Sequence, residues 1–218
     1  MRQALRTRRR RMRRRDDGPG AWSAGWYRAA RRVPSPNVGA RPAGAAVTLA
    51  VVHAISLPPG VWGGDAIERF FTNRLDAAAH PYFAGIAALQ VSAHFLIRRT
   101  GEVVQFAAVD ARAWHAGRSV WRGRDNCNDW SLGVELEGLD GLRFTTAQYQ
   151  RLARLLRDAA RAWPVAEVVG HEHVAPGRKF DPGPGFDWLR LAALLRGSGL
   201  AVPPAEDASG AACQEACG

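Results

Sequence analysis

The chain has 218 residues, which is enough for one domain with a complete hydrophobic core. Hydrophobic residues make up 47% of it, which fits a folded protein and excludes one that is disordered throughout. Three cysteines are too few for a disulfide framework, and no apolar run approaches the length of a membrane-spanning helix.

The net charge of +10 is concentrated at the N-terminus. Residues 1–17 hold nine arginines and two aspartates, so they carry seven of the ten net positive charges. Such a segment is either an arm for nucleic acid or another anionic surface, or a disordered extension, and we expect the second. No specific nucleic-acid partner is therefore expected. No apolar segment follows the arginines, so no secretory signal is expected and the predicted location is cytoplasmic.

Both ends of the chain are expected to lie outside the folded domain. Residues 1–21 are predicted to form a disordered Arg-rich extension, and residues 197–218 a disordered tail. Cys213 and Cys217 belong to that tail, and two thiols on such a segment make a poor metal site. The folded domain is expected to span residues 22–196.

The first half of this domain predicts a strand, a helix and a hairpin. Residues 45–53 form a nearly continuous apolar run, typical of a strand buried on both faces, and the run ends in His53. A helix is predicted from Asp65, which is spaced from Glu68 as in a capping box. Two β-rich runs, residues 91–99 and 102–107, flank Thr100-Gly101 and predict a hairpin.

The second half alternates strands with helices. Residues 131–138 alternate strictly, which puts leucine and valine on one face and Glu135 and Glu137 on the other, as in the wall of a cleft. Residues 145–163 predict an amphipathic helix that opens with a capping box, and residues 187–196 predict a last helix. A strand over residues 166–173 is expected between these two helices. The predicted fold is a single α/β (α+β) domain with a central mixed sheet flanked by helices.

Polar residues gather where two of these strands end. His53 and His171 each end a predicted strand and precede a Pro/Gly-rich loop, and residues 171–181 also contain His173, Lys179 and Asp181. A zinc hydrolase needs three protein ligands, a base for water and a cation for the developing oxyanion. The residues alone leave two choices open: His171 or His173 as ligand, and Glu135 or Glu137 as base.

Lys179 is the one lysine in a chain with twenty-nine arginines. A chain that otherwise uses arginine for positive charge has kept a compact ammonium group at this position, which arginine does not reproduce. This bias suggests a specific role for Lys179.

Six stretches, in order along residues 22–195, resemble the AmpD family of bacterial cytosolic anhydro-N-acetylmuramoyl-L-alanine amidases. This family belongs to the zinc amidases that include phage T7 lysozyme and peptidoglycan recognition proteins. The resemblance implies their mixed-sheet fold. The stretches are RRVPSPN (31–37), VVHAISLPPGVWGG (51–64), HPYFAGIAALQVSAHFLIRRTGEVVQF (80–106), RAWHAGRS (112–119), CNDWSLGVELEG (127–138) and GHEHVAPGRKFDPGPGFDW (170–188).

The resemblance implies a role for each residue of the candidate site. It implies Zn2+ bound by His53, His171 and Asp181, with Glu135 as general base and acid and Lys179 as oxyanion stabiliser. The implied reaction cleaves the amide between the lactyl group of (anhydro-)N-acetylmuramic acid and L-alanine of the stem peptide, in peptidoglycan recycling. The alternative is an amidase that acts on polymeric peptidoglycan.

Substrate recognition is less determined by the sequence. His115 and Arg178 are candidate substrate-binding residues, although each has an equally good structural interpretation. Two residues depart from the family pattern: Ala54 replaces an asparagine and Gln90 an arginine. The expected partner is a small muropeptide, and a monomer is expected. A non-catalytic muropeptide binder would have lost the ligands or Lys179, and this chain has kept them.

Overall fold

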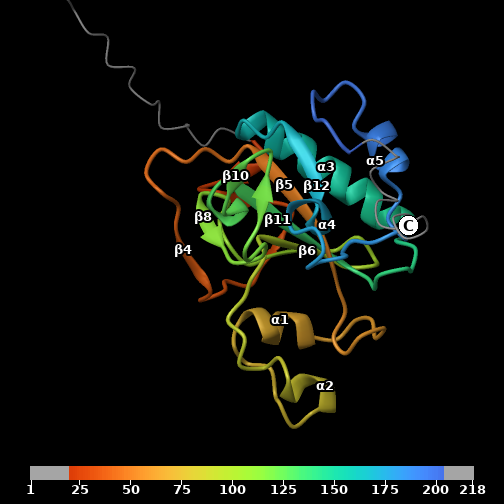
Figure 1. Ribbon diagram of the computed structural model, residues 1–218. Coiled ribbons are helices and arrows are strands. Elements are labelled where there is room, and N and C mark those ends of the chain that lie inside the picture. The colour runs from red at the N-terminus through yellow and green to blue at the C-terminus, as the bar shows by residue number, and fades with distance from the viewer. Residues whose placement is uncertain (1–19, 204–218) are drawn as a thin grey trace, which may run out of the picture.

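A computed structural model describes residues 20–203 of the chain. Its centre is a six-stranded sheet with the order β12-β5-β11-β6-β7-β3 (Figure 1). Strands β12, β5, β11 and β6 are parallel neighbours, and β7 joins β6 as the antiparallel partner of the predicted hairpin. The predicted α/β fold with a central mixed sheet is therefore confirmed. The strands are β3 (Arg31–Arg32), β5 (Leu49–Ile55), β6 (Phe95–Ile97), β7 (Val103–Gln105), β11 (Ser131–Glu137) and β12 (Glu167–Gly170).

One face of the sheet is covered by α3 (Thr146–Ala162) and α5 (Trp188–Leu194) (Figure 1). The side chain of Thr145 accepts the backbone N–H of Gln148 in the predicted capping box. The apolar residues of β11 are fully buried against α3, because strict alternation turns every second side chain of the strand to that face. The residues in this contact include Leu132, Val134, Leu136, Tyr149, Leu152 and Leu156.

The opposite side of the sheet is covered by short elements instead of long helices. A second apolar cluster joins Leu49 and Val51 of β5 to Cys127, Trp130 and Val174. The short elements on this side are β4 (Val38–Ala40), β8 (Ala111–Ala113), β9 (Val120–Trp121), β10 (Arg124–Asp125), η1 (Cys127–Asp129) and α4 (His171–Val174). The pair of strands β1 (Trp22–Ser23) and β2 (Trp26–Tyr27) lies instead on the α3 side, where the side chains of Trp22 and Tyr27 donate to Asp158 of α3.

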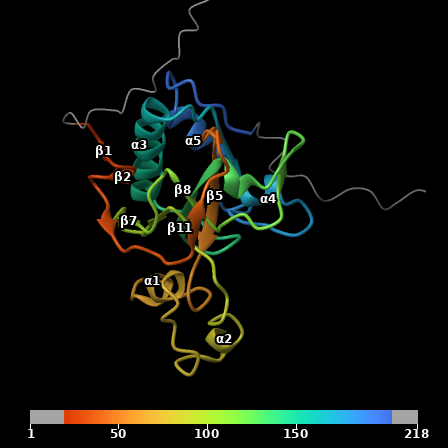
Figure 2. The ribbon, with the colours of Figure 1, turned by 90° about the vertical axis from the view of Figure 1, so that its left-hand side faces the viewer.

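Two short helices, α1 (Ala66–Phe71) and α2 (Pro81–Ala84), lie together at one end of the molecule, apart from α3 and α5 (Figures 1 and 2). Helix α1 begins after Asp65 as predicted, but the predicted capping box is wrong. The Asp65 side chain caps no backbone N–H and instead accepts from Arg69 at 2.7 Å. The charged groups of α1 are therefore used in ion pairs and not at its N-terminus.

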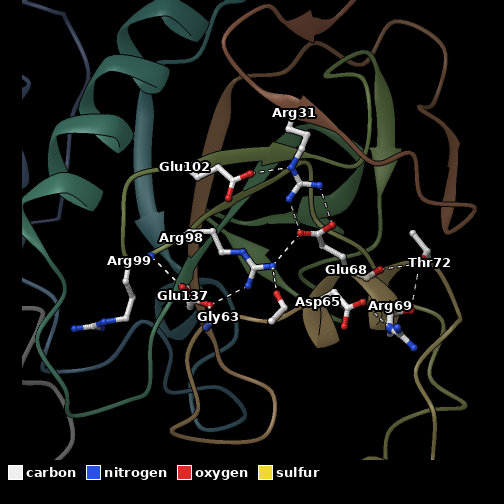
Figure 3. A network of polar contacts seen from close by, with 11 residues as sticks. Arg31, Gly63, Asp65, Glu68, Arg69, Thr72, Arg98, Arg99, Glu102 and Glu137 are labelled. Atoms are coloured by element: carbon white, nitrogen blue, oxygen red, sulfur yellow. Dashed lines mark hydrogen bonds and ion pairs between the residues drawn. The ribbon is translucent and has the colours of Figure 1, made fainter.

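A network of ion pairs ties α1 to the sheet (Figure 3). The guanidinium of Arg98 donates to Glu137 of β11 and to Glu68 of α1, at 2.9 Å each. Arg31 donates to both carboxylate oxygens of the same Glu68. Burial alone would raise the pKa of Glu137, but hydrogen bonds from backbone N–H groups and from Arg98 lower it below its ordinary value. Glu137 is therefore a structural carboxylate.

The limits of the folded part differ slightly from those expected. Strand β5 continues past His53 to Ile55. The domain also runs past the expected boundary at residue 196, because Ala201 pairs with Glu167 of β12 and donates its N–H to the carbonyl of Ala166. Of the predicted extension over residues 1–21 and the predicted tail over residues 197–218, residues 1–19 and 204–218 lie outside the described residues. Among the helices in the described range, none is long and apolar enough to cross a membrane.

The network predicts that its two arginines contribute unequally to the stability of the protein. Arg98 is 6% exposed, so Arg98→Met leaves Glu137 buried without its cation and should lower the free energy of unfolding by about 3–5 kcal/mol. The side chain of Arg31 is 47% exposed, so Arg31→Met should cost less than about 1 kcal/mol. Urea unfolding at pH 7 measures both. Equal losses in the two variants would contradict this account.

Candidate metal and catalytic site

Strand register places three candidate residues side by side. On the adjacent parallel strands β5 and β11, His53 pairs with Glu135, so their side chains project from the same face. On the other side of β5, Gly170 of β12 pairs with Val52. His171 follows Gly170 and therefore arrives level with His53. This local geometry follows from the register in which the three apolar strands pair.

His53, His171 and Asp181 form a compact triangle of ligand atoms. Nδ1 of His53 lies 3.0 Å from Nδ1 of His171, and each of these nitrogens lies 3.1 Å from Oδ2 of Asp181. Both histidines are buried, and Asp181 is half-buried. The backbone carbonyl of Asp181 accepts the N–H of Glu172, which fixes this loop against the first turn of α4. These three residues form a group that could hold a metal ion.

The donor set fits a tetrahedral zinc ion. Nε2 of His171 lies 3.1 Å from the carbonyl of Ala116, which can only accept, so Nε2 carries a proton and Nδ1 is the nitrogen left to bind an ion. Burial lowers the pKa of His53 to about 4, so its ring is neutral at pH 7. Electron-rich atoms packed this closely repel one another unless a cation lies between them. Ligands of a tetrahedral zinc lie about 3.3 Å apart, given zinc–ligand distances of about 2.0–2.1 Å.

His173 faces a different direction from His171, and this difference favours His171 as the ligand of the two. The predicted strand over residues 166–173 is wrong in its last three residues, because β12 ends at Gly170 and His171 begins the helical turn α4. Residues two apart in a helix point in different directions. Nδ1 of His173 accepts the backbone N–H of Gly170 at 2.8 Å, so this ring stabilises the turn.

The two glutamates of β11 differ in their surroundings. Oε1 and Oε2 of Glu137 are both occupied by hydrogen bonds, whereas Oε2 of Glu135 is buried and has no partner within the described residues. Burial, and next the charge of Asp181, raises the pKa of Glu135 well above its ordinary value, while Lys179 lowers it. A bound cation would favour the ionised form further. An unpartnered buried carboxylate beside three ligand atoms is suited to hold a water molecule.

A cavity connects this polar group to an apolar wall. His53, His171, Asp181, Glu135 and Lys179 line it together. The wall comes from α1, α2 and the segment after them, and the ion pairs that tie α1 to the sheet therefore also hold this wall in place. Its apolar residues include Phe70, Phe71, Ile86, Leu89 and Val91, and Tyr82 lines the same cavity. The sequence patterns gave these residues no place in the site, because their helices are short and their side chains converge only in the folded chain.

The two candidate substrate residues occupy different places. His115 lines the cavity, and burial, followed by the neighbouring histidines, lowers its pKa well below the ordinary value. Arg178 lies outside the cavity lining, and its Nη2 donates to the carbonyls of Ala116 and Arg118 at 2.8 and 2.6 Å. Ala54, one of the two departures from the family pattern, is among the residues that line the cavity.

Comparison with known proteins identifies the family. The model of the N-acetylmuramoyl-L-alanine amidase family matches residues 43–184, which include all the site residues described above. The chain is 54% identical to 1,6-anhydro-N-acetylmuramyl-L-alanine amidase AmpD of Citrobacter freundii, over 78% of this chain and 92% of that protein. The chain therefore belongs to the N-acetylmuramoyl-L-alanine amidase family.

Solved structures agree with this assignment. A crystal structure of a selenomethionine derivative of AmpD matches with a TM-score of 0.78 and 54% identity, over 79% of this chain and 98% of that one. The amidase AmiD of Escherichia coli, solved as a complex with anhydro-N-acetylmuramic acid-L-Ala-D-gamma-Glu-L-Lys, matches with a TM-score of 0.52 and 30% identity. That match covers 76% of this chain and 64% of that one.

The different positions of the two histidines on α4 predict different effects on metal binding. His171→Ala removes a ligand atom and should weaken Zn2+ binding by at least about 100-fold, whereas His173→Ala should leave one tightly bound ion per chain. Calorimetric titration of the zinc-depleted protein, with metal analysis after dialysis, measures both. The reverse ranking would show that the triangle is not the metal site.

Proposed function

We propose that this protein is a zinc-dependent amidase that cleaves anhydromuropeptides in the cytoplasm during peptidoglycan recycling. The bond cleaved is the amide between the lactyl group of anhydro-N-acetylmuramic acid and L-alanine of the stem peptide. The observation that carries the proposal is the His53, His171 and Asp181 triangle beside the unpartnered carboxylate of Glu135. The expected form is a monomer whose partner is the small muropeptide itself.

The relatives support the choice of substrate. The AmpD proteins to which the chain is 54% identical are named for the 1,6-anhydro form of the sugar, and the AmiD structure contains an anhydro-muropeptide. The chemical character of the cavity matches such a ligand. Its polar end lies next to an apolar wall that can bury the uncharged parts of a sugar–peptide conjugate.

The proposed mechanism gives a step to each residue. Held by the triangle, a zinc ion would supply a Lewis acid for water and for the scissile carbonyl. Glu135 accepts a proton from the attacking water and returns it to the nitrogen of L-alanine as the amide bond breaks. Lys179 lies at the same cavity and donates to the carbonyl oxygen as negative charge develops on it.

Product analysis tests the function. The zinc-loaded protein should release the free stem peptide from soluble anhydromuropeptides, detected by mass spectrometry, and removal of zinc by a chelator should abolish release until zinc is restored. A parallel assay on intact sacculi separates the two amidase hypotheses. Faster cleavage of sacculi would replace recycling with action on polymeric peptidoglycan, and no cleavage of either substrate would refute the amidase proposal.

Substitution of the two β11 glutamates should have different effects on turnover. Glu135→Gln keeps the shape of the side chain but cannot accept a proton, so kcat should fall by about 10²–10⁴-fold while zinc content stays the same. Glu137→Gln should lower stability and leave kcat of the folded protein close to that of the unsubstituted enzyme. Steady-state kinetics, zinc analysis and thermal unfolding on both variants check this. A larger fall in kcat for Glu137→Gln would contradict the assignment.

Lys179 should act on the transition state more than on substrate binding. Lys179→Ala should lower kcat by about 10²–10³-fold with little change in KM. Lys179→Arg should not restore the rate, because the planar guanidinium does not place a point charge where the ammonium group does. A loss that appears only in KM would instead assign Lys179 to substrate binding.

A further inference from the structure

His115 reaches the metal site through another histidine. Its Nδ1 lies 3.0 Å from Nε2 of His53, and its Nε2 lies 3.2 Å from Oγ of Ser131. Both ring nitrogens therefore contact protein atoms, which leaves neither nitrogen available for a substrate. The inference below rests on the proposed metal site and concerns what this contact does to His53.

The direction of the hydrogen bonds follows from Ser131. Its hydroxyl donates its one proton to the carbonyl of Cys127 at 2.5 Å, so towards His115 it can only accept. Nε2 of His115 must therefore carry a proton, and Nδ1 of that neutral ring is an acceptor. Nε2 of His53 must then donate to it. The proton of His53 is thereby fixed on the side away from the metal site, and its Nδ1 presents a lone pair to His171 and Asp181.

The position of the His115 ring is built into the surrounding chain. The backbone N–H groups of His115 and Ala116 both donate to Oδ1 of Asn128, at 3.1 and 2.8 Å. The ring lies directly over Gly133 of β11, where a Cβ atom would come within 2.4 Å of its Cγ. Ala116 also supplies the carbonyl that fixes the tautomer of His171. One two-residue segment thus orients both metal-binding histidines.

We propose that His115 is a positioning residue that, together with Ser131, holds His53 in the Nε2–H tautomer and so directs its Nδ1 lone pair at the metal. Partners of this kind, which contact a ligand and not the metal, tune metal affinity. His115 is thereby given a role other than the substrate contact expected from sequence.

The test uses the full chain and compares variants that differ in hydrogen-bonding capacity. His115→Leu removes the acceptor, and we expect the Kd for Zn2+, measured by competition with a chromogenic chelator, to rise by about 10–100-fold. His115→Gln offers an amide oxygen and an amide N–H in place of the two ring nitrogens, so it should retain most of the affinity. A Gln variant no better than the Leu variant, or a folded Leu variant with unchanged affinity, overturns the proposal.

Serine variants test the direction of the hydrogen bonds from His53 through His115 to Ser131 while all the histidines are kept. Ser131→Ala removes the acceptor for Nε2–H of His115 and should weaken zinc binding measurably. Ser198→Ala is the matched control, since Ser198 also donates its hydroxyl to a backbone carbonyl, that of Leu195, outside the site. Nitrogen-15 NMR of the zinc-loaded protein should show His115 protonated at Nε2. Protonation at Nδ1 overturns the proposal even if the Leu variant does not fold.

These measurements separate this inference from the proposed function. An unsubstituted protein that binds no zinc refutes the metal site itself. A protein that binds one zinc and cleaves anhydromuropeptide, but whose affinity is the same in the Leu, Gln and Ser131→Ala variants, refutes only the role of His115.

Discussion

The site depends on the register in which β5 pairs with β11 and with β12. It sets His53 opposite Glu135 and brings His171 level with both, so a metal ligand, a base and a second ligand occupy one row. Because side chains alternate along a strand, a shift of one residue in either pairing would turn one member of the row to the other face of the sheet. The apolar cores on the two faces of the sheet resist that shift, so packing far from the site maintains its geometry.

The sequence predicted the parts of this arrangement that depend on local pattern. The apolar run before His53, the strict alternation through Glu135 and the capping box at Thr145 each have a period or spacing that reports one element. Two local predictions were wrong, one strand end and one capping box. The strand expected to reach His173 ends earlier because α4 starts at His171, and the capping box expected at Asp65 gives way to an ion pair with Arg69. In each case two local arrangements compete for the same residues, and the pattern alone does not say which of them forms.

The sequence predicted the metal-binding residues of the site but not the groups that hydrogen-bond to them. Residues alone suggested a metal centre but could not choose between His171 and His173, and the family resemblance made that choice; the geometry of α4 supplies the reason for it. The hydrogen-bonded partners behind the ligands were not predictable, since Ser131, Asn128 and the carbonyl of Ala116 come from segments with no metal-binding signature. Outer contacts of this kind become visible only when the chain is folded.

The three ligand atoms come from segments far apart in the chain, and this has a thermodynamic consequence. An ion bound by His53, His171 and Asp181 would cross-link β5 to the loop after α4, and the unfolded chain cannot offer the same arrangement. Binding and folding would then be linked, and an ion present at about 1,000 times its Kd would add about 4 kcal/mol to stability. Metal supply would thus affect how much of the chain is folded as well as how fast the folded chain turns over substrate.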